Sequence, residues 1–155
     1  MFKKGFIDNL EEEEDVQSNP LYGKTLYLAC SKSKLSVPQA KAVELYNGTL
    51  FKLGVRLAHK YHMPIVILSA KYGFIQEFEV IKNYDEKMKN YTGPYPDKKG
   101  FYIGGKDYFG NAPSHIQRLV PKSGNGLMAH NIRLLIDGHS QESLFCKPRK
   151  SKKNY

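Results

Sequence analysis

Two short apolar runs, KTLYLAC at residues 24–30 and PIVIL at residues 64–68, decide the fold class of this 155-residue chain. Each has the length of a buried strand, and each changes abruptly into a polar loop, SKSK at 31–34 and SAKYG at 69–73. A helical pattern with an apolar stripe lies between them, from Thr49 to about His62. A strand, helix, strand unit of this size predicts two parallel neighbouring strands with a right-handed connection.

The rest of the chain is consistent with further helices and strands around this unit. A helical pattern opens at Pro38 and continues to Tyr46, where Asn47 and Gly48 interrupt it. The segment 78–88 resembles a loop followed by a short helix, and residues 127–136 have the pattern of a final helix. We therefore expect a single three-layer α/β/α domain with a mostly parallel central sheet.

Charge separates two arms from this domain, which we place at residues 21–145. Residues 1–20 have a net charge of −4 and are expected to form a flexible acidic arm, although Phe2, Phe6, Ile7 and Leu10 would also suit a short amphipathic helix that docks on a partner. Residues 146–155 are expected to form a basic tail. The whole chain carries +9, so the domain itself is basic and attracts polyanions, of which nucleic acid is the most abundant.

Several classes of protein are disfavoured by what the sequence lacks. No run approaches the roughly 18 residues of a membrane span, and no apolar signal segment opens the chain, so we expect a cytoplasmic protein without a membrane partner. Two distant cysteines, Cys30 and Cys146, cannot form a disulfide framework. The five histidines lack the spacing of metal ligands, and neither a P-loop nor a GxSxG elbow is present, so no metal and no cofactor is expected.

The candidate site follows from the parallel strands, because ligands of open α/β sheets bind at the carboxyl edge. The two loops that leave this edge each begin with serine and contain lysine. Ser31, Lys34, Ser69 and Lys71 would then hold phosphate groups or base edges, unless these are ordinary solvent-exposed loops. Cys30 fits a small core residue, or alternatively a thiolate favoured by the neighbouring lysines.

Aromatic and acidic residues near these loops extend the candidate site. Tyr46 or Tyr72 could stack on a base, Gly73 could adopt a positive φ or let a ligand approach, and Tyr84 precedes the one acid that we single out. That acid, Asp85, would serve as a general base or stabilise a developing cation if it is buried near the lysines. It would equally serve as the N-cap of a helix over EKMK.

Four motifs in order resemble a domain family of unassigned function that is frequent in phage and bacterial genomes. They are CSKSK at 30–34, PQAKAVELYNG at 38–48, LSAKYGFI at 68–75 and VIKNYD at 80–85. More distantly, the pattern is similar to the YaaA peroxide-stress proteins. Relatives of those proteins are associated with DNA binding and with work on nucleobases, so the resemblance implies such a role here.

These indications lead to two functional hypotheses. The first is an N-glycosidase-like enzyme, independent of metals, that acts on a nucleobase in DNA or in a modified nucleotide, with Asp85 and Lys34 as catalytic residues. For a base inside a duplex, extrusion of that base would also be needed. The alternative is a non-catalytic viral or bacterial module that binds DNA, a nucleotide or a host protein through the same crevice.

Overall fold

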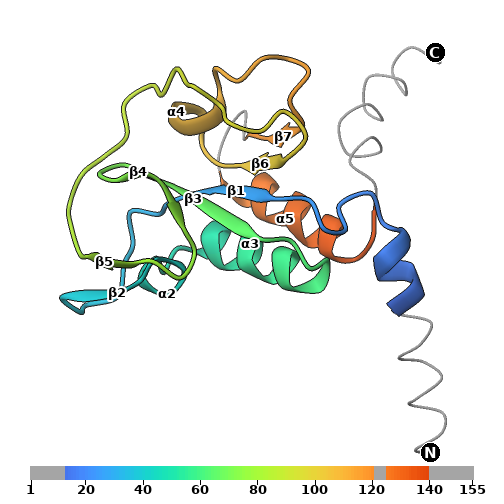
Figure 1. Cartoon of the computed structure of the whole chain (residues 1–155), viewed down its shortest axis with the longest axis horizontal. Coiled ribbons are helices and arrows are strands. Elements are labelled where there is room, and N and C mark those ends of the chain that lie inside the picture. The colour runs from blue at the N-terminus through green and yellow to red at the C-terminus, as the bar shows by residue number, and fades with distance from the viewer. Residues whose placement is uncertain (1–12, 121–124, 140–155) are drawn as a thin grey trace, which may run out of the picture.

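The computed structural model describes residues 13–120 and 125–139, and within them a five-stranded sheet forms the centre of the molecule (Figure 1). Its strands are β1 (Leu26–Ala29), β3 (Ile65–Ser69), β4 (Gly73–Gln76), β6 (Phe101–Ile103) and β7 (Arg118–Leu119), in the order β4-β3-β1-β6-β7. β4 alone among them is antiparallel to its neighbour. The expectation of a mostly parallel sheet is therefore confirmed.

The two apolar runs become the centre of this sheet. β1 pairs with β3 in parallel, with Leu26 opposite Ile65 and Ala29 opposite Leu68. The connection between them contains α3 (Thr49–Lys60), close to where the apolar stripe predicted a helix. α3 ends before His62, whose φ of 54° takes the chain out of the helical conformation.

One face of the sheet is covered by two long helices. α3 and α5 (Asn125–Ile136) pack side by side beneath β1, and their apolar residues share one core with those of the strands (Figure 1). Leu26 and Leu28 point into this core because alternate residues of a strand face the same side. The final helix is thus confirmed, and both helices begin at the same end of the molecule (Figure 1).

The opposite face is covered mainly by chain without regular structure. Tyr27 and Tyr102 stack there with their ring centroids 4.4 Å apart. The segment 83–100 lies over them and contributes Met88, Tyr91 and Tyr95, together with Phe109 from the one-turn helix α4 (Lys106–Phe109). Tyrosine suits this position because its ring fills the core while its hydroxyl reaches a backbone carbonyl. A third, helical layer is not confirmed.

A two-stranded sheet projects beside the main one, and here two predictions were wrong. β2 (Gln39–Lys41) pairs antiparallel with β5 (Val80–Lys82), so the helix expected from Pro38 is reduced to α2 (Ala42–Leu45). The helix expected within 78–88 is likewise replaced by β5 and extended chain. Both segments are short, and the hydrogen bonds between two strands distant in sequence outweighed their local helical pattern.

The two predicted arms lie partly or wholly outside the described residues. Of residues 1–20, the structure describes 13–20, where 13–18 are helical and Val16 is buried in the main core. The amphipathic pattern at 2–10 and the basic tail at 146–155 fall outside the described part. In the ranges 13–120 and 125–139, no helix has the length and apolarity needed to cross a bilayer.

Candidate functional site

The structure brings the polar loops after β1 and β3 together at the carboxyl edge of the sheet. Three hydroxyl groups, those of Tyr46, Ser69 and Tyr84, are hydrogen-bonded to one another there, and we call them the hydroxyl cluster. Ser69 ends β3, Tyr84 follows β5, and Tyr46 is paired through its backbone with Lys34 of the loop after β1. The Tyr84 oxygen lies 2.6 Å from that of Tyr46 and 2.9 Å from Ser69 Oγ. Tyr46 and Ser69 are almost fully buried, at 3% and 1% exposure, so these bonds are shielded from water.

Ser69 orients the cluster. Its Oγ accepts hydrogen bonds from the backbone N–H groups of Lys71 and Tyr72, at 3.1 and 3.0 Å. A serine hydroxyl has two acceptor lone pairs and one proton. Because both lone pairs are used by the amides, Ser69 must donate its proton to Tyr84. The turn that follows β3 therefore fixes the direction of this hydrogen bond.

Burial keeps the tyrosines of the cluster neutral. It raises the pKa of Tyr46 to about 12, and the hydrogen bond to Tyr84 only partly opposes this. Burial also raises the pKa of Tyr84 far above its ordinary value. Both groups therefore remain hydroxyls at neutral pH, each with one proton to donate.

Lys34 is held over this cluster by backbone pairing. Residues 33–35 run antiparallel to 45–47, with Leu35 N–H donating to the Leu45 carbonyl at 2.9 Å. This pairing places Lys34 Nζ 4.4 Å from the centroid of the Tyr84 ring, which is the distance of a cation–π contact. The lysine expected to bind substrate thus lies directly beside the hydroxyl cluster.

The loop after β3 supplies a second lysine and an exposed aromatic ring. The ring of Tyr72 packs edge-on against Tyr84, with centroids 5.5 Å apart, and Lys71 Nζ lies 5.4 Å from the Tyr72 centroid. Gly73 has the positive φ expected of it, +74°, which turns the chain from this loop into β4. Lys34 and Lys71 are therefore on the same side of the molecule, linked through Tyr84 and Tyr72.

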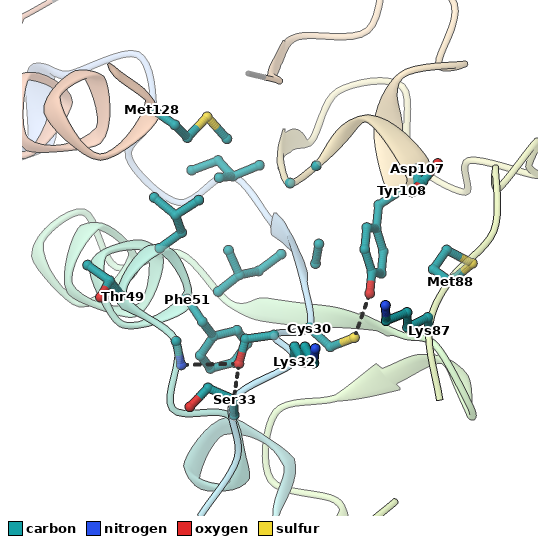
Figure 2. Close-up of a pocket in the computed structure, with 18 of the residues that line it drawn as sticks. Cys30, Lys32, Ser33, Thr49, Phe51, Lys87, Met88, Asp107, Tyr108 and Met128 are labelled. Carbon is teal, nitrogen blue, oxygen red and sulfur yellow. Dashed lines mark hydrogen bonds between the residues drawn. The ribbon is translucent and has the colours of Figure 1, made fainter. Parts of the chain in front are cut away.

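Next to the hydroxyl cluster is a cavity of about 690 Å³ (Figure 2). It lies between the carboxyl ends of β1 and β6, the first turns of α3 and α5, and one stretch of the extended segment. The residues around it come from five places: 28–33, 48–51, 86–88, 103–108 and 126–129. Ser31 is the one predicted site residue among them; the hydroxyl cluster and Lys34 lie beside this cavity rather than in its wall.

The wall of the cavity at α3 is built by a close contact between Ser31 and Gly48. Ser31 Oγ accepts a hydrogen bond from Gly48 N–H at 3.1 Å and donates one to the Ser33 carbonyl at 2.7 Å. A Cβ at position 48 would lie 2.7 Å from Ser31 Cβ, closer than such atoms approach, so glycine is required there. The loop after β1 is thereby fixed to the start of α3.

On the opposite wall, Cys30 contacts a tyrosine that the sequence analysis did not place in the site. Cys30 Sγ lies 3.2 Å from the hydroxyl of Tyr108, and Figure 2 shows this pair at the side of the cavity with Lys87 and Met88. Burial, followed by the interaction with Cys30, raises the pKa of Tyr108 far above its usual range. Cys30 is half-buried and packs against the main core, the position expected of a small core residue.

Asp85 is not brought into the site. Its side chain is exposed, and it is absent from the residues that line the cavity. It does not cap a helix either, because residues 83–97 have no regular structure. The next residue, Glu86, lines the cavity, as does Asp107 of α4. No group of three or more potential metal ligands occurs in the described ranges.

One signal in the sequence bears on the cavity residues that lie beside β6. The turn Gly104-Gly105 and Tyr108 belong to GGKDYFG, which follows FYI. FYI is the parallel strand β6, so its carboxyl end lies at the same edge as those of β1 and β3. FYI is only three residues long and lies in a segment rich in glycine, proline and tyrosine, so its sequence alone does not identify it as a strand.

The structure is that of an open α/β domain with a cavity at the carboxyl edge of its parallel strands, the edge at which ligands of such sheets bind. Residues 26–99 match the model of a family described as "Family of unknown function (DUF6884)". The matched range includes the loops after β1 and β3 and the hydroxyl cluster, and it confirms the expected resemblance to a domain family of unassigned function. No curated protein and no solved structure matches the chain significantly.

Proposed function

We propose that this domain binds a nucleotide, free or as part of DNA, in the cavity at the carboxyl edge. The observation that carries the proposal is the combination of size and wall chemistry in that cavity. Its volume, about 690 Å³, is within the range of small-molecule sites. Leu50, Met88 and Tyr108, which are only partly buried, offer apolar surface to a base, while Lys32 and Lys87 offer charge to a phosphate.

Backbone dipoles support the placement of the phosphate. α3 and α5, each of twelve residues, both begin at the cavity wall. Helix N-termini present unpaired N–H groups and partial positive charge, which favour an anion. A phosphate beside Gly48 would also lie near the hydroxyls of Ser31 and Thr49. The net charge of +9 favours such a ligand at long range.

Binding is tested by titrating the protein with deoxynucleoside 5′-monophosphates in a calorimeter. We expect saturable binding that Lys32→Gln and Lys87→Gln each weaken, and that the matched surface change Lys52→Gln leaves unchanged. If no heat of binding is measured at millimolar nucleotide, the proposal is contradicted. Cytoplasmic action follows from it, because nucleotides and DNA are both available there.

Glycosidic cleavage is a second candidate, favoured by two carboxylates in the cavity wall. Glu86 and Asp107 both line the cavity. Cleavage of an N-glycosidic bond develops positive charge on the sugar, which a nearby carboxylate stabilises while it orients water. In this version either residue takes the role that the sequence suggested for Asp85, and the neutral tyrosine Tyr108 remains a hydrogen-bond donor.

The enzyme and the binding module are separated by one assay. Free base is measured by mass spectrometry after incubation with nucleotides and with single-stranded and duplex DNA. If the domain is a glycosidase, Glu86→Gln or Asp107→Asn abolishes base release while binding persists, and Asp85→Asn has no effect. If no base is released from any of these, the non-catalytic module is the correct description.

A further inference from the structure

We propose that the site takes its nucleotide from a single strand of nucleic acid, whose neighbouring nucleotides lie on an exposed aromatic strip outside the cavity. The strip consists of Phe78, Lys41, Tyr72 and Lys71. This inference rests on the proposed function, because it concerns what is attached to the nucleotide in the cavity. It names the substrate class as a polynucleotide strand rather than a free nucleotide.

The strip pairs two exposed rings with two ammonium groups. Phe78 is 65% exposed, and Lys41 Nζ lies 5.8 Å from its centroid. Tyr72 is 36% exposed, and Lys71 Nζ lies 5.4 Å from its centroid. An exposed ring beside a lysine is the arrangement that binds one nucleotide of a single strand, since the base stacks on the ring and the ammonium reaches the phosphate.

The strip is held in place by the two-stranded sheet of β2 and β5. Lys41 is in β2 opposite Val80 of β5, and Phe78 immediately precedes β5. Tyr72 is fixed to the same sheet, because its hydroxyl donates to the Lys82 carbonyl at 3.0 Å. Figure 1 shows this sheet at the end of the molecule where α3 begins.

A series of side-chain contacts connects the strip to the cavity. Ser31, Lys32 and Ser33 line the cavity, and the next residue, Lys34, lies over Tyr84. Tyr84 in turn contacts the ring of Tyr72. A strand that leaves the cavity in this direction meets Lys34 and then the ring of Tyr72, and Phe78 lies beyond it, at the other end of β5 from the Lys82 carbonyl that Tyr72 contacts.

The charges of the strip favour nucleic acid over an apolar protein partner. Two acids lie near Phe78, but Glu77 accepts a hydrogen bond from the Ile65 amide at 3.0 Å and Glu79 accepts one from the Gln76 amide. Both carboxylates keep their negative charge, but three lysines, Lys41, Lys71 and Lys82, are exposed on the strip and its two-stranded sheet, so the positive charges outnumber the two acids. Lysine is depleted at the centres of protein interfaces because its ammonium is costly to desolvate, but phosphate compensates that cost.

The test is fluorescence anisotropy with a labelled oligothymidylate of about twelve nucleotides, a length within the site sizes of single-strand binders. We expect Phe78→Ala to weaken binding about 5- to 100-fold, the loss typical of one stacked base. Lys41→Gln should lower the slope of log affinity against log salt by about 0.7, the value for one phosphate of a single strand. A duplex of the same length should bind less tightly.

Matched controls come from the other end of the molecule. Tyr22 is a similarly exposed ring, 38% exposed, and Lys60 Nζ lies 5.4 Å from the centroid of Tyr61. Tyr22→Ala and Lys60→Gln should therefore leave the affinity for the oligonucleotide unchanged. Thermal melting of all four variants confirms that each is folded.

Other outcomes distinguish failure of the strip from failure of the cavity. If thymidine monophosphate binds but the oligonucleotide binds no more tightly, the strip is overturned and the cavity is retained. If the oligonucleotide binds and Phe78→Ala has the same affinity as Tyr22→Ala, the strip is also overturned. If sedimentation shows dimers that Phe78→Ala converts to monomers, the surface is a contact between copies and the proposal is wrong. If neither ligand binds, both proposals fail.

Discussion

Replacing Ser69 with alanine tests whether this serine holds the turn after β3 to Tyr84 in the segment after β5. The serine is 1% exposed, and its Oγ serves the amides of Lys71 and Tyr72 and the hydroxyl of Tyr84. Alanine removes all three hydrogen bonds at once without changing the backbone. The two amide donors and the Tyr84 oxygen are then left without this partner in a partly buried position.

The expected loss of stability follows from these three groups. A buried polar group left without a partner costs about 1–3 kcal/mol, and part of this is recovered when a loop relaxes toward water. We therefore expect Ser69→Ala to lower the free energy of unfolding by about 2–4 kcal/mol. For a domain of this size, that corresponds to a decrease of about 4–16 °C in the melting temperature.

The assay is urea denaturation followed by circular dichroism, with Ser36→Ala as the matched control because Ser36 is an exposed serine. The control should change the free energy of unfolding by less than about 0.5 kcal/mol. A loss for Ser69→Ala as small as that of the control would refute the claim that this serine joins the turn after β3 to Tyr84. The comparison requires that the slope of the free energy of unfolding against urea concentration is the same for the variant and the control.

Three further predictions follow from the same site. The free energy of unfolding should fall as the pH rises from about 10 to 12, because Tyr46, whose pKa is about 12 in the folded protein, ionises near 10 once unfolded. A titration followed at 295 nm in which every tyrosine of the folded protein ionises with a midpoint near pH 10 would contradict this. Gly48→Ala should weaken nucleotide binding and lower the free energy of unfolding by about 1–3 kcal/mol. Gly126→Ala, whose added methyl meets no atom within 4 Å, should leave the stability unchanged or raise it; equal melting temperatures for the two variants would show that the loop before α3 tolerates the methyl at position 48. Asp85→Asn should leave nucleotide affinity unchanged in calorimetry, whereas Glu86→Gln should raise it, because a negative charge is removed from the cavity wall; the reverse result would restore Asp85 to the site.

The central unit of the fold could be predicted because its signals are local and strong. KTLYLAC and PIVIL are continuous apolar runs with abrupt polar ends, and the stripe of α3 has helical spacing. Parallel pairing of the two strands then follows from the length of the connection. The meeting of the loops that contain Lys34 and Lys71 was predictable for the same reason.

The parts that were not predicted depend on contacts between distant segments. β2 and β5 are only three residues each, and they form because each pairs with the other across about forty residues of chain. β6 is equally short and is a strand because it lies beside β1. Without β6, neither the turn at Gly104 nor Tyr108 could be assigned to the carboxyl edge, and so the cavity was missed.

The position of Asp85 could not be read from its neighbours. An acid after an apolar segment is compatible with a buried base, a helix cap or a surface residue. The extended path of residues 83–100 over the sheet decides among these, because it turns Met88 toward the core and leaves Asp85 exposed. That path is set by packing on Tyr27 and Tyr102, far away in sequence.

The most direct test of nucleotide binding at the carboxyl edge is an amide NMR titration of the isotope-labelled protein with deoxynucleoside 5′-monophosphates. We predict saturable shift changes at residues 31–33, 48–51 and 104–105, which surround the cavity between β1, β6 and α3. Shift changes confined to the opposite end of the molecule, around the hollow formed by residues 13–20, 60–61 and 137–138, would contradict it. So would a spectrum that does not change at all.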